Sequence, residues 1–207
     1  APQPETAALV EQIRAGALDG PPVGVPPAVI SEAAPRHNLP AQLSSFVGRE
    51  RDRADVVERL QSSRLVTLTG SGGSGKTRLA LRVAESMIDD CSDGVWLTEL
   101  TPLSDPALIL PTVAAVFDVR EVTGRALLDG LIRHLRNLHL LLVLDNCEHL
   151  IGASAQLIDA LLRGAPRLRV LATSREPLGL AGESVYRVPS LSLPEAGALA
   201  LEQLARS

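Results

Sequence analysis

The stretch TLTGSGGSGKTRLA, residues 67–80, limits what this chain can fold into more than any other part of its sequence. The spacing G-x-x-x-x-G-K-[ST] is matched there by Gly70, Gly75, Lys76 and Thr77. Lys76 is the only lysine in a chain that otherwise uses arginine. Glycines let backbone N–H groups curl around phosphate oxygens, and a compact ammonium group suits such a cradle better than a planar guanidinium. The stretch therefore predicts a phosphate-binding loop between a strand and a helix.

The predicted loop would bind a nucleotide together with Mg²⁺. Lys76 would reach the β- and γ-phosphates, and the Thr77 hydroxyl would hold the metal ion. The positive end of the helix that starts here adds to the attraction for phosphate. The loop residues expected to contact the nucleotide are Gly70, Ser71, Gly72, Gly73, Ser74, Gly75, Lys76 and Thr77. A flexible glycine-serine turn is the alternative, which the placement between a predicted strand and a predicted helix disfavours.

The apolar run LLLVLDN places Asp145 at the tip of a buried strand, where a carboxylate beside the Mg²⁺ ion is expected. An ordinary turn after a strand is the alternative. Active ATPases of this class usually carry a second carboxylate at the next position to activate water, but this chain has Asn146. Glu148 lies nearby and is a weaker candidate for that base.

The run VLATSRE places Arg175 just past the end of the following strand. In an open α/β sheet this edge faces the ligand crevice, so the guanidinium could sense a γ-phosphate. A surface arginine is the alternative. We therefore treat Lys76, Asp145 and Arg175 as candidate catalytic residues, and Thr77 and Asp145 as the metal-binding pair.

Strand and helix patterns alternate from residue 64 onward, which predicts an α/β fold. Near-continuous apolar runs such as LHLLLVLDN are typical of strands buried on both faces of a parallel sheet. We expect a P-loop NTPase domain over residues 41–190, with a mostly parallel sheet and helices on both faces. Residues 1–18 would end a preceding helical domain, 19–40 would form a proline-rich linker, and 191–207 would start another helical domain. Because the chain opens on Ala1 and stops inside a predicted helix, we expect it to be part of a longer protein.

Charge and apolar pattern exclude several other classes of protein. The net charge is −4 and the basic residues are dispersed, so this segment is not expected to contact nucleic acid directly. No apolar run approaches the roughly 20 residues that a membrane span needs, which predicts a cytoplasmic protein without membrane contact. Cys91 and Cys147 lack the spacing of a disulfide or metal framework and are assigned to packing.

Four segments, taken in order, closely resemble the NB-ARC-like STAND ATPases of bacterial transcriptional regulators, especially the SARP and LuxR-like groups. They are NLPAQLSSFVGRE, LVTLTGSGGSGKTRLAL, LLLVLDNCEHL and LRVLATSREPLGL. In addition, PETAALVEQIRAG looks like the last helix of a transcriptional activator domain. SLSLPEAGALALEQLA resembles the entry into the helical domain that follows the nucleotide fold.

The resemblance assigns further residues to the nucleotide. It implies that Val47, Gly48 and Arg49 contact its adenine side, and that Arg175 senses the third phosphate. It also implies that an asparagine after the strand-end aspartate is normal for slow hydrolysers of ATP.

The function that this resemblance implies is a regulatory switch. ADP would hold a closed state, ATP would permit an open state competent for assembly, and hydrolysis would be slow. The partners would be the nucleotide, other domains of the same chain and, in the ATP state, further copies in a homo-oligomer. The alternative is a turnover ATPase of another P-loop class, such as a motor-type ATPase or a small-molecule kinase, although no acceptor site or lid is visible. A pseudo-ATPase scaffold is disfavoured because the loop, Thr77 and Asp145 are all intact.

We predict that Lys76→Arg abolishes nucleotide binding while the fold survives. A guanidinium is too wide for the loop and cannot supply the same point charge. Isothermal titration with ATP and ADP measures the first effect, and circular dichroism checks the second. Wild-type affinity in this variant would contradict the assignment of the loop.

Overall fold

The computed structural model of this protein describes residues 36–41, 48–121 and 126–189. The secondary-structure elements are, in chain order, α2 (Glu50–Ser62), β1 (Leu65–Thr69), α3 (Lys76–Ser86), β2 (Val95–Glu99), η1 (Pro106–Leu108), α4 (Ile109–Val116), α5 (Leu127–Leu135), β3 (Leu141–Asp145), η2 (Cys147–His149), α6 (Ile151–Gly164), β4 (Arg169–Ser174) and β5 (Glu183–Arg187). The helix predicted within residues 1–18 and the helical domain predicted from 191 lie outside the described residues. None of the described helices is long and apolar enough to cross a membrane.

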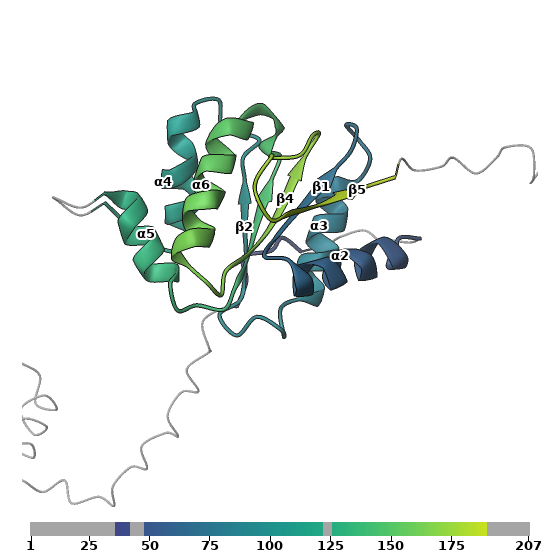
Figure 1. The fold of residues 1–207 in the computed structure, drawn as a ribbon, viewed down its shortest axis with the longest axis horizontal. Coiled ribbons are helices and arrows are strands. Elements are labelled where there is room, and N and C mark those ends of the chain that lie inside the picture. The colour runs from purple at the N-terminus through teal and green to yellow at the C-terminus, as the bar shows by residue number, and fades with distance from the viewer. Residues whose placement is uncertain (1–35, 42–47, 122–125, 190–207) are drawn as a thin grey trace, which may run out of the picture. The chain divides into compact units, whose positions relative to one another are not determined.

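The five strands form one parallel sheet in the order β2-β3-β4-β1-β5 (Figure 1). β1 and β3 are buried along their whole length, as expected for apolar runs that have a helix layer on each side. Because every strand runs in the same direction, all of their carboxyl ends lie at one edge of the sheet. The predicted α/β fold with a parallel sheet is confirmed.

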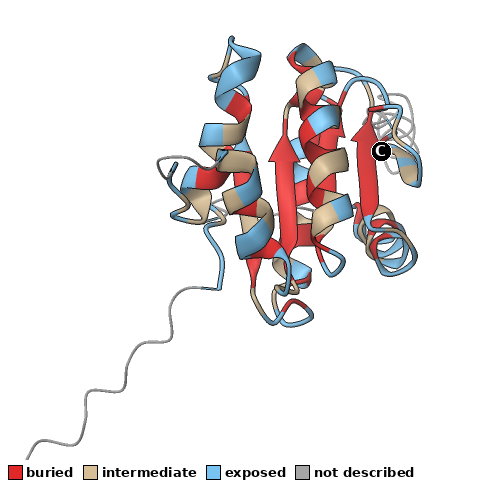
Figure 2. Ribbon diagram, turned by 60° about the vertical axis from the view of Figure 1, so that its left-hand side comes forward, coloured by how far each residue is buried: buried red, intermediate tan, exposed pale blue. Residues whose placement is uncertain are grey.

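Helices cover both faces of the sheet, α2 and α3 on one and α4, α5 and α6 on the other (Figure 1). Leu79, Val83 and Met87, spaced four residues apart along α3 and just beyond its end, are buried together against the first face. On the second face the core is aliphatic, with Leu131, Leu142 and Ile158 fully buried. Figure 2 shows the result, a buried sheet between helices whose outer surfaces are exposed.

The helical segment after β2 begins with a short 3₁₀ turn, η1, that runs directly into α4. The Asp105 side chain accepts a hydrogen bond from the Ala107 N–H at 2.9 Å and so caps this turn. Pro111 is the third residue of α4. Its missing N–H lies in the first turn, where no intrahelical partner is needed, so the helix continues through it.

The last residues of the predicted linker lie along the outer edge of β2. The Val95 N–H donates to the Arg36 carbonyl oxygen at 2.9 Å. The Asn38 side chain makes the two hydrogen bonds that the backbone of a neighbouring strand would make. Its Nδ2 donates to the Leu97 carbonyl at 2.8 Å, and its Oδ1 accepts from the Leu97 N–H at 2.6 Å. This contact covers the backbone groups that an edge strand otherwise leaves unpaired.

We predict that Gly94→Ala destabilises the protein by about 2–3 kcal/mol. Gly94 has φ +92°, and an added Cβ would collide with the Arg36 carbonyl, so both the backbone conformation and the contact of residues 36–38 require glycine. Urea unfolding provides the measurement. Gly152→Ala is the matched control: this helical glycine has open space around its Cβ position, so the change should alter the free energy of unfolding by less than about 1 kcal/mol. Equal unfolding free energies for the two variants would contradict the proposed role of Gly94.

Candidate functional site

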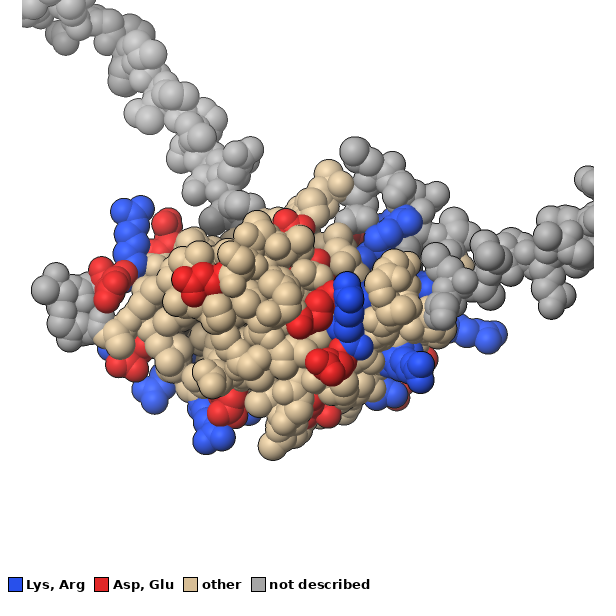
Figure 3. Space-filling view, turned by 90° about the horizontal axis from the view of Figure 1, so that it is seen from above, with Lys and Arg blue, Asp and Glu red and all other residues tan. Residues whose placement is uncertain are grey.

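The residues singled out from the sequence converge at the carboxyl edge of the sheet. The phosphate loop follows β1, Asp145 ends β3, and Arg175 follows β4. The strand arrowheads point upward in Figure 2, and Figure 3 looks down onto this edge, where acidic and basic side chains are interspersed. In open parallel sheets this is the edge at which ligands bind.

Three glycines of the loop adopt backbone conformations that L side chains rarely take. Gly70, Gly73 and Gly75 have φ values of +153°, +74° and +85°. A Cβ on Gly70 would lie 3.0 Å from Ser74 Oγ and 3.1 Å from the Val188 carbonyl oxygen. The backbone can therefore curl tightly only because these positions carry no side chain. The loop ends at the start of α3, where the first N–H groups have no partner inside the helix.

Lys76 folds back into this curl instead of extending into solvent. Its side chain is only 8% exposed, and Nζ donates to the carbonyl oxygens of Gly70 at 3.0 Å and Ser71 at 3.1 Å. Both acceptors belong to the loop itself. The ammonium group is thus held at the centre of the cradle, in reach of an anion bound there.

The metal-binding pair predicted from the sequence is in direct contact. Thr77 Oγ1 donates to Asp145 Oδ1 at 2.8 Å and lies 3.1 Å from Oδ2. Asp145 is 5% exposed and needs such donors, because an unpaired buried carboxylate is costly. A hydroxyl and a carboxylate at the foot of a phosphate cradle are oxygen ligands of the kind that Mg²⁺ prefers.

A third residue of this cluster, Thr173, was missed in the sequence. Its hydroxyl donates to Asp145 Oδ1 at 2.6 Å and accepts from the Asn146 N–H at 2.9 Å. Thr173 lies on β4, which pairs with β3 in parallel, so it comes next to the end of the strand that carries Asp145. The available signal was a polar residue within the apolar run of a predicted central strand.

Arg175 reaches the predicted edge but pairs there with Glu148. Arg175 Nε lies 3.2 Å from Glu148 Oε1, and the two side chains are 69% and 15% exposed. The side-chain amide of Asn146 lies between Glu148 and His149, and Asn146 itself has φ +67°, a left-handed conformation that asparagine tolerates. The sensor role of Arg175 therefore stays a prediction, and Glu148 is engaged by a cation.

Arg49 is brought against the phosphate loop by the start of α2. The side chain is 7% exposed, Nη2 donates to the Pro189 carbonyl at 2.9 Å, and Cζ lies 3.9 Å from the position of a Cβ on Gly75. Nη1 is buried and has no hydrogen-bond partner among the described residues. Gly48 precedes it with φ +88°, whereas Val47 lies outside the described residues. A buried donor beside the loop fits an anionic ligand such as a nucleotide.

The two cysteines are buried and serve packing, as the sequence suggested. Burial raises the pKa of the Cys147 thiol to about 12, so it stays protonated at neutral pH. Its Sγ lies 3.6 Å from the Leu144 carbonyl. Although Cys147 follows β3 closely, its protonated thiol is not a nucleophile there.

Comparison with known proteins identifies similar sequences and folds. A family model described as an AAA domain matches residues 58–179, more than half of the chain. A protein of Mycobacterium tuberculosis named as a candidate HTH-type transcriptional regulator is 44% identical over 136 residues, which are 66% of this chain and 15% of that protein. An uncharacterised protein of the same species is 41% identical over 158 residues, covering 76% of this chain and 40% of the relative. The chain thus spans well under half the length of these relatives.

Two solved structures have a similar fold at low sequence identity. One is a STAND protein with a tetratricopeptide repeat sensor from Pyrococcus horikoshii, with a TM-score of 0.56 and 18% identity over 83% of this chain and 27% of that one. The other is Cdc6p from Pyrobaculum aerophilum, with a TM-score of 0.54 and 20% identity over 72% of this chain and 46% of that one. Both confirm the P-loop type of α/β fold.

We predict that Thr173→Val lowers the free energy of unfolding by about 1–3 kcal/mol, because it leaves the Asn146 N–H and one Asp145 oxygen without this buried partner. Thr67→Val on β1 is the matched control. The Thr67 hydroxyl is buried with no hydrogen-bond partner in the described residues, so removing it should be neutral or stabilising. Thermal or urea denaturation of both variants tests the difference, and similar losses would argue against a role for Thr173 in holding Asp145.

Proposed function

Because this chain belongs to the AAA domain family of P-loop ATPases, we propose that it binds ATP and ADP as the regulatory switch module of a longer bacterial transcriptional regulator. The observation that carries the proposal is the contact of Thr77 with Asp145, 2.8 Å apart, directly behind a glycine loop that holds Lys76 at its centre. This arrangement provides a phosphate cradle and oxygen ligands in one place.

In this proposal each part of the site has one task. The loop from Gly70 to Gly75 surrounds the phosphates with backbone N–H groups, and Lys76 turns from the loop carbonyls toward the phosphate oxygens. Thr77 and Asp145 would hold a Mg²⁺ ion bound with the nucleotide, and this ion would supply positive charge to neutralise the phosphates. Arg49 offers the nucleotide its Nη1, which has no hydrogen-bond partner among the described residues, from the side of α2.

Slow hydrolysis fits the residues around Asp145 better than rapid turnover does. The position after Asp145 carries an amide, Asn146, which cannot take a proton from water. The nearest other carboxylate considered for this task, Glu148, is paired with Arg175 at 3.2 Å. In this pair Glu148 Oε1 accepts a hydrogen bond from Arg175 Nε, so that oxygen is occupied by the guanidinium instead of a water molecule. A turnover ATPase would require Glu148 to leave this pair and act as the base.

The Glu148–Arg175 pair also suggests how the third phosphate could be sensed. Arg175 is mostly exposed, so its ion pair is weak and easily exchanged for a more highly charged partner. A γ-phosphate would compete with Glu148 for the guanidinium, whereas ADP has no group to do so. Binding energy available to ATP alone is what a switch needs, since a ligand shifts a conformational equilibrium only by its differential affinity.

The similar proteins suggest which larger protein this switch module belongs to. Proteins named as HTH-type transcriptional regulators contain a similar segment within a chain several times longer, which supports further domains beside this one. The shared fold with a STAND protein agrees with an NB-ARC-like module whose nucleotide state controls assembly. A homo-oligomer in the ATP state and a cytoplasmic location are parts of the same proposal.

Arg175→Ala tests the switch by comparing two nucleotides on the full-length protein. A charge-assisted contact contributes roughly 1.5–3 kcal/mol, so ATP affinity should fall roughly 10- to 150-fold while ADP affinity stays unchanged. Arg163→Ala is the control, because Arg163 is also an exposed arginine paired with a carboxylate, Asp159, but lies on α6. Wild-type turnover should stay below the 1–100 per second typical of kinases.

Equal losses of ATP and ADP affinity in Arg175→Ala would mean that Arg175 supports the fold or the loop, and its sensor role would be given up. Turnover in the kinase range would favour a turnover ATPase with Glu148 as the base.

A further inference from the structure

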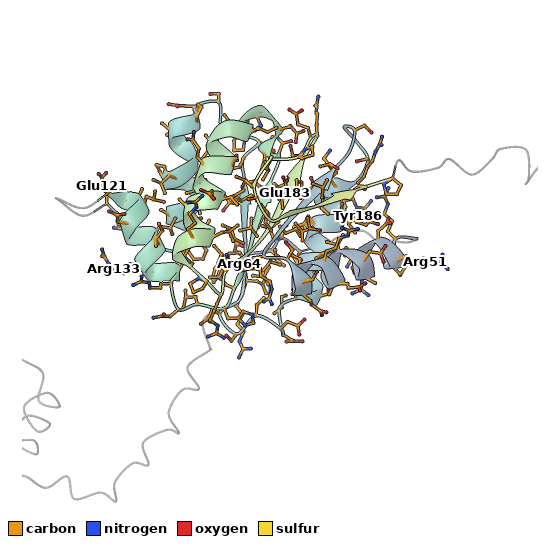
Figure 4. All side chains as sticks on the ribbon, in the orientation of Figure 1. Arg51, Arg64, Glu121, Arg133, Glu183 and Tyr186 are labelled. Atoms are coloured by element: carbon orange, nitrogen blue, oxygen red, sulfur yellow. The ribbon has the colours of Figure 1, made fainter. Side chains whose placement is uncertain are left out.

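A hydrogen bond between β5 and α2 ends close to the nucleotide site. Tyr186, labelled in Figure 4, projects from β5 toward α2, and its hydroxyl donates to Asp52 Oδ1 at 2.6 Å. This distance lies within the range of a charge-assisted bond from a hydroxyl to a carboxylate. Burial and the neighbouring Asp52 raise the pKa of Tyr186 above its usual value near 10, so the hydroxyl keeps its proton and remains a donor at neutral pH.

The second oxygen of the same carboxylate faces Arg49. Asp52 Oδ2 lies 3.8 Å from Arg49 Nη1, close enough for electrostatic attraction but too far for a hydrogen bond. A movement of about 1 Å would bring the pair to the 2.7–2.9 Å of a charge-assisted bond. In the structure the carboxylate lies at this longer distance while its other oxygen accepts the hydrogen bond from Tyr186.

Because Asp52 does not form a hydrogen bond with Arg49, one N–H donor of the guanidinium is left without an acceptor among the described residues. Its Nη1 is the buried nitrogen that has no hydrogen-bond partner among the described residues, while Nη2 is satisfied by the Pro189 carbonyl. Leaving a buried donor unpaired costs free energy, and here the donor lies beside the phosphate loop. If Asp52 closed on Nη1, the guanidinium would lose the donor that a nucleotide could use.

We propose that Tyr186 is a positioning residue that holds Asp52 back from Arg49 and so keeps the Arg49 guanidinium available to the nucleotide. This inference rests on the proposed contact between Arg49 and the nucleotide. In it, Asp52 is a competitor for Arg49, and the Tyr186 hydroxyl restrains the competitor by binding its other oxygen. β5 thereby affects nucleotide affinity through two side chains without touching the ligand.

The alternative role for Tyr186 is purely structural: its hydrogen bond to Asp52 would hold β5 against α2. Arg59 of α2 also contacts β5. Its Nη1 donates to Ser184 Oγ at 3.1 Å, and its guanidinium lies over the Tyr186 ring. If Tyr186 only stabilises the packing of β5 on α2, the loss of ADP affinity in Tyr186→Phe should not depend on the charge of Asp52. A restraint on Asp52 should depend on that charge completely.

The experiment measures the affinity of the full-length protein for ADP by isothermal titration. Tyr186→Phe should weaken ADP binding about tenfold, about 1.4 kcal/mol, because Asp52 is then free to close on Arg49. Adding Asp52→Asn to that variant removes the competing charge and should restore affinity to within about twofold of wild type. In an Arg49→Ala background, Tyr186→Phe should cause no further loss. Ser184→Ala, which removes the hydrogen bond between Arg59 of α2 and Ser184 of β5, should bind ADP like wild type.

Three results would overturn the inference: unchanged affinity in Tyr186→Phe, a loss that persists in the double variant with Asp52→Asn, or an equal loss in the Arg49→Ala background. Circular dichroism and melting curves show whether each variant is folded. Failure of the proposed function looks different, because then the wild-type protein would not bind ADP, or would bind it equally well after Lys76→Arg.

Discussion

The burial of one carboxylate organises the site at the carboxyl edge of the sheet. Asp145 is 5% exposed, and an ionised group in such a position is tolerated only when its oxygens accept hydrogen bonds. One donor, Thr77, comes from the helix after β1, and another, Thr173, comes from β4. The hydrogen bonds to Asp145 therefore bring together the end of β3, the start of α3 and the end of β4. They also place the Asp145 carboxylate directly behind the phosphate loop.

The parallel sheet makes this arrangement possible. β4 lies between β3 and β1, so the strand that carries Thr173 separates the strand that carries Asp145 from the one that leads into the loop. Side chains at the ends of adjacent parallel strands come within hydrogen-bond distance without any long loop. The helices on the two faces exclude water from the strands, which strengthens the hydrogen bonds at their ends. Fold and site thus depend on the same alignment of strands.

The features that could be predicted from the sequence are those that depend on the residues of a single strand or loop. Apolar runs located the strands, the glycine spacing located the loop, and Asp145 was identified because it ends a strand. Thr173, Tyr186 and Asp52 were not identified, because their roles depend on which elements are neighbours. A threonine in a strand or a tyrosine near a sheet edge has no distinctive spacing, and only the strand order and the packing of α2 on the sheet bring these side chains to their partners.

The attachment of residues 36–38 to β2 has a mechanical meaning. A load applied at Arg36 along the direction of β2 would act on the hydrogen bonds to Val95 and Leu97. Because these bonds run across the direction of the strand, such a load would shear them together and would not open them one at a time. From β2 the load passes to β3, because Glu99 is paired in register with Asp145. A pull along β2 would therefore act, through the hydrogen bonds between β2 and β3, on the strand that ends at Asp145.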